Sequence, residues 1–234
     1  MQDVVQRYIE HMMKKHGVSA VMAAGSYVTG RMGPNSDIDL FFIWPREYEA
    51  LRGREFFEGL EFEYFMSPEW KFYDRMRGDP VSVRVYSQGR VIDDPEGRLQ
   101  KIIDTAKEKA AERPPAPDER LRRDFKFWLE TIRRDGEDLF DRKSFDNLAY
   151  FIGANLPRMT DLAARLRGAP PVYGKYGVEE IEAAEPAYGA LLRDLLRSAP
   201  SNRGRREAWV GLCSYLERQL GEVDVTDYFS LQKL

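Results

Sequence analysis

Cysteine and histidine are almost absent from this sequence. Its 234 residues include a single cysteine, Cys213, and two histidines, His11 and His16. A disulfide within the chain, a cysteine zinc cluster and a histidine-rich metal site are therefore excluded. A lone cysteine is typical of a reducing compartment. Any chemistry of this chain must depend on carboxylates, hydroxyls and cations.

The sequence also lacks a long apolar run and a marked excess of charge of either sign. The longest apolar stretch, residues 38–44, is interrupted by Asp39 and is far shorter than a membrane-spanning helix. No basic and apolar leader follows Met1, so we expect a cytoplasmic protein that does not contact a membrane. The 36 basic residues nearly balance the 39 acidic ones, so no global basic field favours nucleic acid as a partner.

A proline-rich segment divides the chain into two parts with different patterns. Residues 113–117 contain three prolines, which end helices and stiffen the backbone. We expect one domain over residues 1–112, a linker over 113–117 and a second domain over 118–234. The second part is helical almost throughout, because four apolar stripes at helical spacing begin at Phe125, Phe145, Leu191 and Trp209. We therefore expect an all-α helical bundle after the linker.

The first part mixes helical and strand patterns, which predicts an α/β (α+β) domain. Apolar residues at helical spacing predict a helix over residues 3–15. β-prone runs predict strands over residues 18–24, 37–44, 54–57, 60–66 and 81–86, followed by a short one at 91–92. Glu58-Gly59 predicts a hairpin turn. Further helices are expected over residues 67–77, capped by Ser67 and Pro68, and over residues 95–111.

The strongest chemical signal joins a glycine–serine pair to two aspartates. Gly25-Ser26 follows one predicted strand, and Asp37-Ile38-Asp39 opens another after ten intervening residues. Strand alternation places both aspartates on one face, where two ionised carboxylates need a cation between them. Oxygen ligands favour Mg²⁺ or Mn²⁺, and two such ions would fit the two-metal pattern of nucleotide transfer. Gly25 permits close backbone approach, and Ser26 offers a hydroxyl and N–H groups to a phosphate.

A third carboxylate would complete this cluster. Glu61 and Glu63 both lie on one face of the predicted strand at residues 60–66. We prefer Glu63, because it lies where the strand is well established, while Glu61 is close to the turn. Its role would be that of a further metal ligand or of the base that takes a proton from an acceptor hydroxyl.

Residues 25–30 and 35–40, Gly-Ser-Tyr-Val-Thr-Gly and Asn-Ser-Asp-Ile-Asp-Leu, resemble the signature of the DNA polymerase β-type nucleotidyltransferase superfamily. The resemblance covers the N-terminal part and implies a catalytic domain with a small mixed sheet and helices on one side. It also implies that Gly25 and Ser26 hold the nucleotide and that Asp37, Asp39 and Glu63 hold the metal. The helical second part is similar in arrangement to bacterial aminoglycoside- and lincosamide-type antibiotic nucleotidyltransferases, in which helices close over nucleotide and acceptor.

Three further residues are candidates for contacts to the nucleotide. Arg31 and Ser36 belong to the loop between the two halves of the motif, and Lys175 is the cation of a glycine- and tyrosine-rich loop. Resemblance to the antibiotic enzymes suggests a triphosphate contact for Lys175, with Tyr173 or Tyr176 near the base or the acceptor. A solvated surface position explains Arg31 and Lys175 as well.

The sequence therefore predicts an enzyme that moves a nucleoside monophosphate, with AMP as first candidate, from a nucleoside triphosphate to a hydroxyl of a small acceptor. Pyrophosphate would be released. The alternatives are a protein hydroxyl or an RNA end as acceptor, the RNA being bound by Arg203, Arg205 and Arg206. A non-catalytic module that binds a nucleotide or a partner, and a purely structural role of the motif, are further hypotheses. A homodimer is compatible with the sequence.

Overall fold

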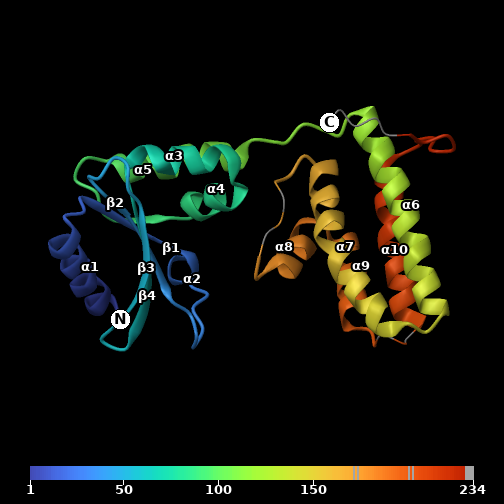
Figure 1. Cartoon of the computed structure of the whole chain (residues 1–234), viewed down its shortest axis with the longest axis horizontal. Coiled ribbons are helices and arrows are strands. Elements are labelled where there is room, and N and C mark those ends of the chain that lie inside the picture. The colour runs from blue at the N-terminus through green and yellow to red at the C-terminus, as the bar shows by residue number, and fades with distance from the viewer. Residues whose placement is uncertain (171, 173, 200, 202, 230–234) are drawn as a thin grey trace. The chain divides into compact units, whose positions relative to one another are not determined.

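The protein consists of two compact units, Met1–Glu112 and Arg113–Leu234 (Figure 1). The computed structural model describes residues 1–170, 172, 174–199, 201 and 203–229. An α+β unit is followed by a helical one, as the sequence predicts. Among the described helices, none is long and apolar enough to cross a membrane.

A small mixed sheet of five strands forms the centre of the first unit. Its order is β3-β4-β2-β1-β5. The strands are β1 (Ala20–Ala24), β2 (Ile38–Ile43), β3 (Leu51–Phe57), β4 (Leu60–Ser67) and β5 (Arg90–Asp93). β2 and β4 are parallel, and the other neighbours are antiparallel. The expected hairpin turn is confirmed, because Glu58 and Gly59 join β3 to β4 with φ values of 46° and 81°.

Helices cover both faces of this sheet, whereas the family resemblance implied helices on one side. The helices are α1 (Gln2–His16), α2 (Gly25–Thr29), α3 (Glu69–Gly78), α4 (Pro80–Ser87) and α5 (Arg98–Ala111). Ile38 and Leu40 pack with α1 in one buried cluster. Phe41 and Ile43 pack with α3, α4 and α5 in another. Because alternate residues of β2 enter separate cores, apolar side chains pack against both faces of the strand.

The predicted strand at residues 81–86 is wrong, because these residues form most of α4. Asp79 caps this helix by accepting hydrogen bonds from the Val81 and Ser82 N–H groups at 3.0 and 3.2 Å, and Pro80 occupies the first turn. A side-chain cap followed by proline stabilises a helix start.

The sequence also predicts Ser67 as the cap of α3, and this prediction is wrong. Ser67 ends β4, and Pro68 precedes the first residue of α3.

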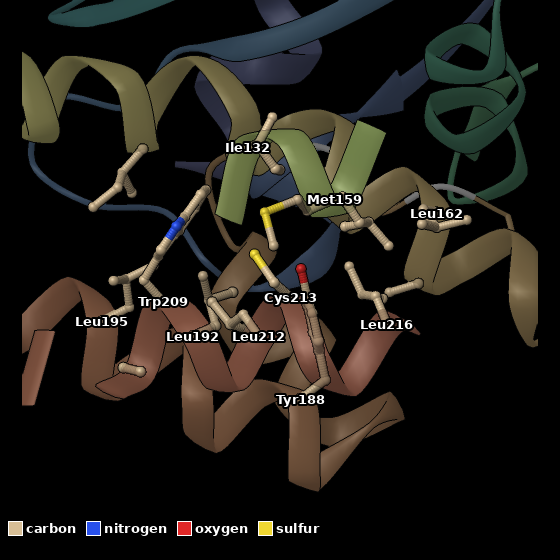
Figure 2. Packing of buried hydrophobic residues seen from close by; sticks show 14 of the residues in the cluster. Ile132, Met159, Leu162, Tyr188, Leu192, Leu195, Trp209, Leu212, Cys213 and Leu216 are labelled. Atoms are coloured by element: carbon tan, nitrogen blue, oxygen red, sulfur yellow. The ribbon is translucent and has the colours of Figure 1, made fainter. Parts of the chain in front are cut away.

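The second unit is a helical bundle around a continuous apolar core. Its helices are α6 (Glu119–Asp141), α7 (Phe145–Leu166), α8 (Gly177–Ala184), α9 (Pro186–Arg197) and α10 (Arg203–Leu220). Trp209, Leu212 and Cys213 of α10 lie in this core with Met159 and Tyr188 (Figure 2). Burial raises the pKa of the Cys213 thiol to about 12. This thiol is therefore a packing group and not a nucleophile.

The basic cluster at the start of α10 is bound to neighbouring parts of the bundle. Arg206 Nη1 donates to Asp141 at 2.9 Å and Nη2 to Glu137 at 3.3 Å. Arg203 pairs with Glu207 at 2.8 Å. Arg205 Nε donates to the Leu195 carbonyl at 3.3 Å. Arg205 therefore joins α10 to α9 and Arg206 joins α10 to α6, whereas the exposed Arg203 pairs within α10.

The Asp79 cap can be tested by substitution. We expect Asp79→Ala to lower the free energy of unfolding by about 1 kcal/mol, because two N–H groups at the start of α4 lose their acceptor. Asp74→Ala is the control, since Asp74 only forms an exposed pair with Arg77 and should contribute less than about 0.5 kcal/mol. Urea denaturation followed by circular dichroism measures both. Equal effects would contradict the capping role of Asp79.

Candidate functional site

Three carboxylates meet where the central strands β2 and β4 lie side by side. Asp37 immediately precedes β2, Asp39 lies in β2 and Glu63 lies in β4. An oxygen atom of each carboxylate lies within 4.8 Å of the others. Asp39 is the register partner of Glu63 in the parallel pair, so both side chains leave the same face of the sheet. We call these three residues the acidic triad; Glu61 does not belong to it.

The acidic triad concentrates negative charge in a half-buried place. Burial raises the pKa of Asp39 to about 6, and the charges of Asp37 and Glu63 add to the increase. Arg52 opposes the shift. A carboxyl group with a raised pKa among like charges is a typical feature of a functional site. A divalent cation would relieve this repulsion.

Two arginines of the edge strand β3 face the glutamates of β4. Arg52 Nε donates to Glu63 Oε1 at 2.7 Å, and Arg54 Nη1 lies 3.1 Å from Glu61 Oε1. Neither pair is predicted from the sequence. The signal that could have indicated them is the presence of two alternating arginines on one side of the predicted hairpin turn and two alternating glutamates on the other, which can pair diagonally.

Gly25 lies directly against the acidic triad, and any larger residue there would displace the Asp39 side chain. The preceding residue, Ala24, is the register partner of Asp39 across β1 and β2. Gly25 has a φ of +68°, and a Cβ atom at this position would overlap with Asp39 Oδ2. Both the backbone conformation and the close approach therefore require glycine. This explains why the glycine–serine pair and the aspartates occur together in the sequence.

Ser26 follows at the start of α2 and is half-buried. Its carbonyl accepts hydrogen bonds from the Gly30 and Arg31 backbone N–H groups, which close the short helix. Among the residues that the structure describes, none forms a hydrogen bond with the Ser26 hydroxyl. This hydroxyl therefore has no partner among the described residues, one position after the glycine that lies against Asp39.

The other candidate nucleotide contacts have different surroundings. The Ser36 hydroxyl accepts a hydrogen bond from the Gly33 N–H at 2.9 Å and so shapes the loop before Asp37. Arg31 is exposed directly after α2. Lys175 belongs to the second unit, where its Nζ lies 5.9 Å from the centroid of the Tyr176 ring. Tyr173 lies outside the described residues.

The donor set of the acidic triad fits a hard divalent cation. It offers carboxylate oxygens alone, without nitrogen or sulfur, and these are the ligands that Mg²⁺ and Mn²⁺ prefer. The residues present are therefore compatible with one or two such ions, held by Asp37, Asp39 and Glu63.

Gly25→Ala tests the contact with Asp39, and Gly30→Ala is a matched control. Both glycines have positive φ values, but a Cβ at Gly30 meets no atom within 4 Å. We expect Gly30→Ala to lower the free energy of unfolding by about 1 kcal/mol through backbone strain alone. Gly25→Ala should cost at least twice as much, because Asp39 must also move. Equal losses in urea denaturation would contradict the close contact.

The raised pKa of Asp39 predicts a dependence of stability on pH in EDTA. Because the folded protein binds the Asp39 proton more tightly than the unfolded chain, ionisation of Asp39 costs stability as the pH rises from about 4 to about 6. Asp39→Asn removes this cost, so it should stabilise the protein at pH 8 by about 1–2 kcal/mol, with a smaller gain at pH 4.5. Urea denaturation at both pH values measures the gain. A destabilised Asp39→Asn protein at pH 8, with Asp74→Asn unchanged, would contradict this account.

A comparison with family models gives a match over the region that contains the acidic triad. Residues 5–114 match the family model described as nucleotidyltransferase domain. Comparison with curated proteins gives no match. Among solved structures, a nucleotidyltransferase-like protein from Exiguobacterium sibiricum is similar over 91% of this chain and 73% of its own, with 16% sequence identity and a TM-score of 0.47.

The matched range contains Gly25, Ser26 and the acidic triad. The resemblance of the second part to antibiotic nucleotidyltransferases gains no support from these comparisons. The expected superfamily gains support at the level of the domain, because residues 5–114, just under half of the chain, match the model of the nucleotidyltransferase domain.

Proposed function

We propose that this protein is an enzyme that moves a nucleoside monophosphate from a nucleoside triphosphate, with ATP as first candidate, to a hydroxyl of a small acceptor. The observation that carries the proposal is the convergence of Asp37, Asp39 and Glu63 beside Gly25-Ser26 within a nucleotidyltransferase domain. Residues 1–112 would form the catalytic domain, residues 113–117 the linker and residues 118–234 the helical domain of a cytoplasmic protein.

Asp37 and Asp39 would hold Mg²⁺, with Mn²⁺ as a substitute, and Glu63 would complete the ligand set. When bound, one or two such ions neutralise phosphate charge and activate the attacking and leaving oxygens. The chain itself positions the triphosphate. Gly25 lets the phosphates approach the backbone, and the Ser26 hydroxyl donates to a phosphate oxygen of the β/γ pair.

The reaction is an in-line displacement at the α-phosphorus. The acceptor oxygen forms a new bond to phosphorus, the bond to the pyrophosphate oxygen breaks, and pyrophosphate leaves with the electron pair. Glu63 would either serve as the third ligand or accept the proton of the acceptor hydroxyl. It has one oxygen committed to Arg52 and a second that forms no hydrogen bond with a described residue.

A small hydroxylated acceptor, such as an aminoglycoside-like or lincosamide-like compound, agrees best with the charges of the chain. The net charge is −3, and Arg203, Arg205 and Arg206 are engaged in contacts within the bundle. An RNA end would require such cations to be available for phosphates. Arg31, Ser36 and Lys175 remain proposed nucleotide contacts. A protein hydroxyl as acceptor is an outcome that the assay below distinguishes.

Calorimetric titration tests the nucleotide part of this proposal without knowledge of the acceptor. ATP, GTP, CTP and UTP are titrated into the full chain with Mg²⁺ or with EDTA. We expect one triphosphate, with ATP as first candidate, to bind only with Mg²⁺. Its affinity should fall at least about tenfold in the Asp37→Asn/Asp39→Asn double variant, because the ligands of the cation are lost. Absence of binding for every triphosphate would contradict the proposal and favour a partner-binding module.

Glu63→Gln and Glu61→Gln form a matched pair for the transfer step. Pyrophosphate release is measured with small hydroxylated acceptors, an RNA oligonucleotide and protein substrates. Glu63→Gln should reduce turnover about 100-fold or more, because the third carboxylate is lost. Glu61→Gln should stay within about threefold of the unmodified protein, since Glu61 lies outside the acidic triad. The reverse order would contradict the choice of Glu63.

A further inference from the structure

Arg52 makes an unusually one-sided contact with the acidic triad. Its Nε donates to Glu63 Oε1 at 2.7 Å, and its Nη2 lies 2.5 Å from the same oxygen. Both donors therefore contact Glu63 Oε1, and Arg52 makes no contact with Oε2. The guanidinium also lies 5.1 Å from the centroid of the Phe65 ring, so it rests on the surface of the sheet.

The side chain of Arg52 extends along the hairpin towards the acidic triad. The register partner of Arg52 is Phe65, yet its guanidinium reaches Glu63, two residues along β4. Arg54 leans the same way, from its register partner Glu63 to Glu61. The two ion pairs have similar exposure, with 70% and 22% for Arg52 and Glu63 against 68% and 27% for Arg54 and Glu61. They differ in that only the first includes a member of the acidic triad.

We propose that Arg52 is a resident counter-ion of the acidic triad, whose positive charge opposes the binding of a divalent cation at Glu63. The inference rests on the proposed function, because it assumes that the triad is a cation site. A guanidinium and a divalent cation on the same carboxylate repel each other, so each weakens the binding of the other. Arg52 thereby neutralises part of the charge of the acidic triad, which would hold a free cation less tightly than three carboxylates alone.

The charge of Arg52 affects the order in which the cation and the triphosphate bind. A triphosphate brings negative charge that offsets Arg52, whereas a free cation does not. The cation therefore enters the site together with the triphosphate more readily than before it. Glu63 would then offer an oxygen to the cation, while the guanidinium of Arg52 would remain beside the site as a positive charge.

Titration of the full chain with Mn²⁺, followed by electron paramagnetic resonance of the free ion, tests this inference without nucleotide or turnover. Arg52→Met should bind Mn²⁺ about threefold to tenfold more tightly than the unmodified protein, because the charge of Arg52 no longer opposes the ion. Arg52→Lys keeps the charge and should stay within about twofold. Arg54→Met is the matched control and should also stay within about twofold, because its guanidinium pairs with Glu61.

Unchanged or weaker Mn²⁺ binding in Arg52→Met would overturn the inference, and weaker binding would assign Arg52 to the orientation of Glu63 instead. Arg52→Gln repeats the removal of charge, so a folding defect in one variant does not decide the result. The Asp39→Asn variant distinguishes a failure of the Arg52 inference from a failure of the proposed metal site. If Asp39→Asn weakens Mn²⁺ binding but the Arg52 variants leave the Mn²⁺ affinity unchanged, only this inference fails. If no variant binds Mn²⁺ through Asp39, the proposed metal site fails as well.

Discussion

The repulsion among three carboxylates is the constraint on which the rest of the site depends. The parallel register of β2 and β4 sets Asp39 beside Glu63, and Asp37 is held one strand repeat away. This closeness is maintained because β2 is packed from both faces by separate apolar cores, so the strand cannot shift to relieve it. Gly25 gives Asp39 room, and Arg52 supplies the nearest positive charge. The surrounding residues thus accommodate a charge density that a cation would neutralise.

The helical unit uses its charged residues mainly to hold its own helices together. Arg206 joins α10 to α6, and Arg167 pairs with Glu185 at 3.4 Å. Glu182 likewise pairs with Arg193. Several residues of the basic and acidic runs, which suggest ligand binding in a linear sequence, therefore form ion pairs within the helical unit.

The sequence predicted the local features of this site well and the long-range ones less well. Strand alternation placed Asp37 and Asp39 on one face, and Glu58-Gly59 located the hairpin correctly. The parallel pairing of β2 with β4 joins segments more than twenty residues apart, so no local pattern specifies Asp39 opposite Glu63. Residues 81–86 were misassigned because alternating valines fit both a strand and a half-buried helix, and the Asp79 cap decided the outcome. The Arg52–Glu63 pair requires the exact register of the hairpin and was missed for that reason.

An anomalous-difference map from crystals of the full chain, grown with Mn²⁺ and a non-hydrolysable triphosphate analogue, would locate the metal ions directly. We expect manganese peaks coordinated by Asp37 and Asp39, with the phosphates next to Gly25 and Ser26. Glu63 should then be turned from Arg52 towards the metal. A bound analogue with no manganese at the acidic triad, or manganese bound only elsewhere, would contradict the proposed metal site.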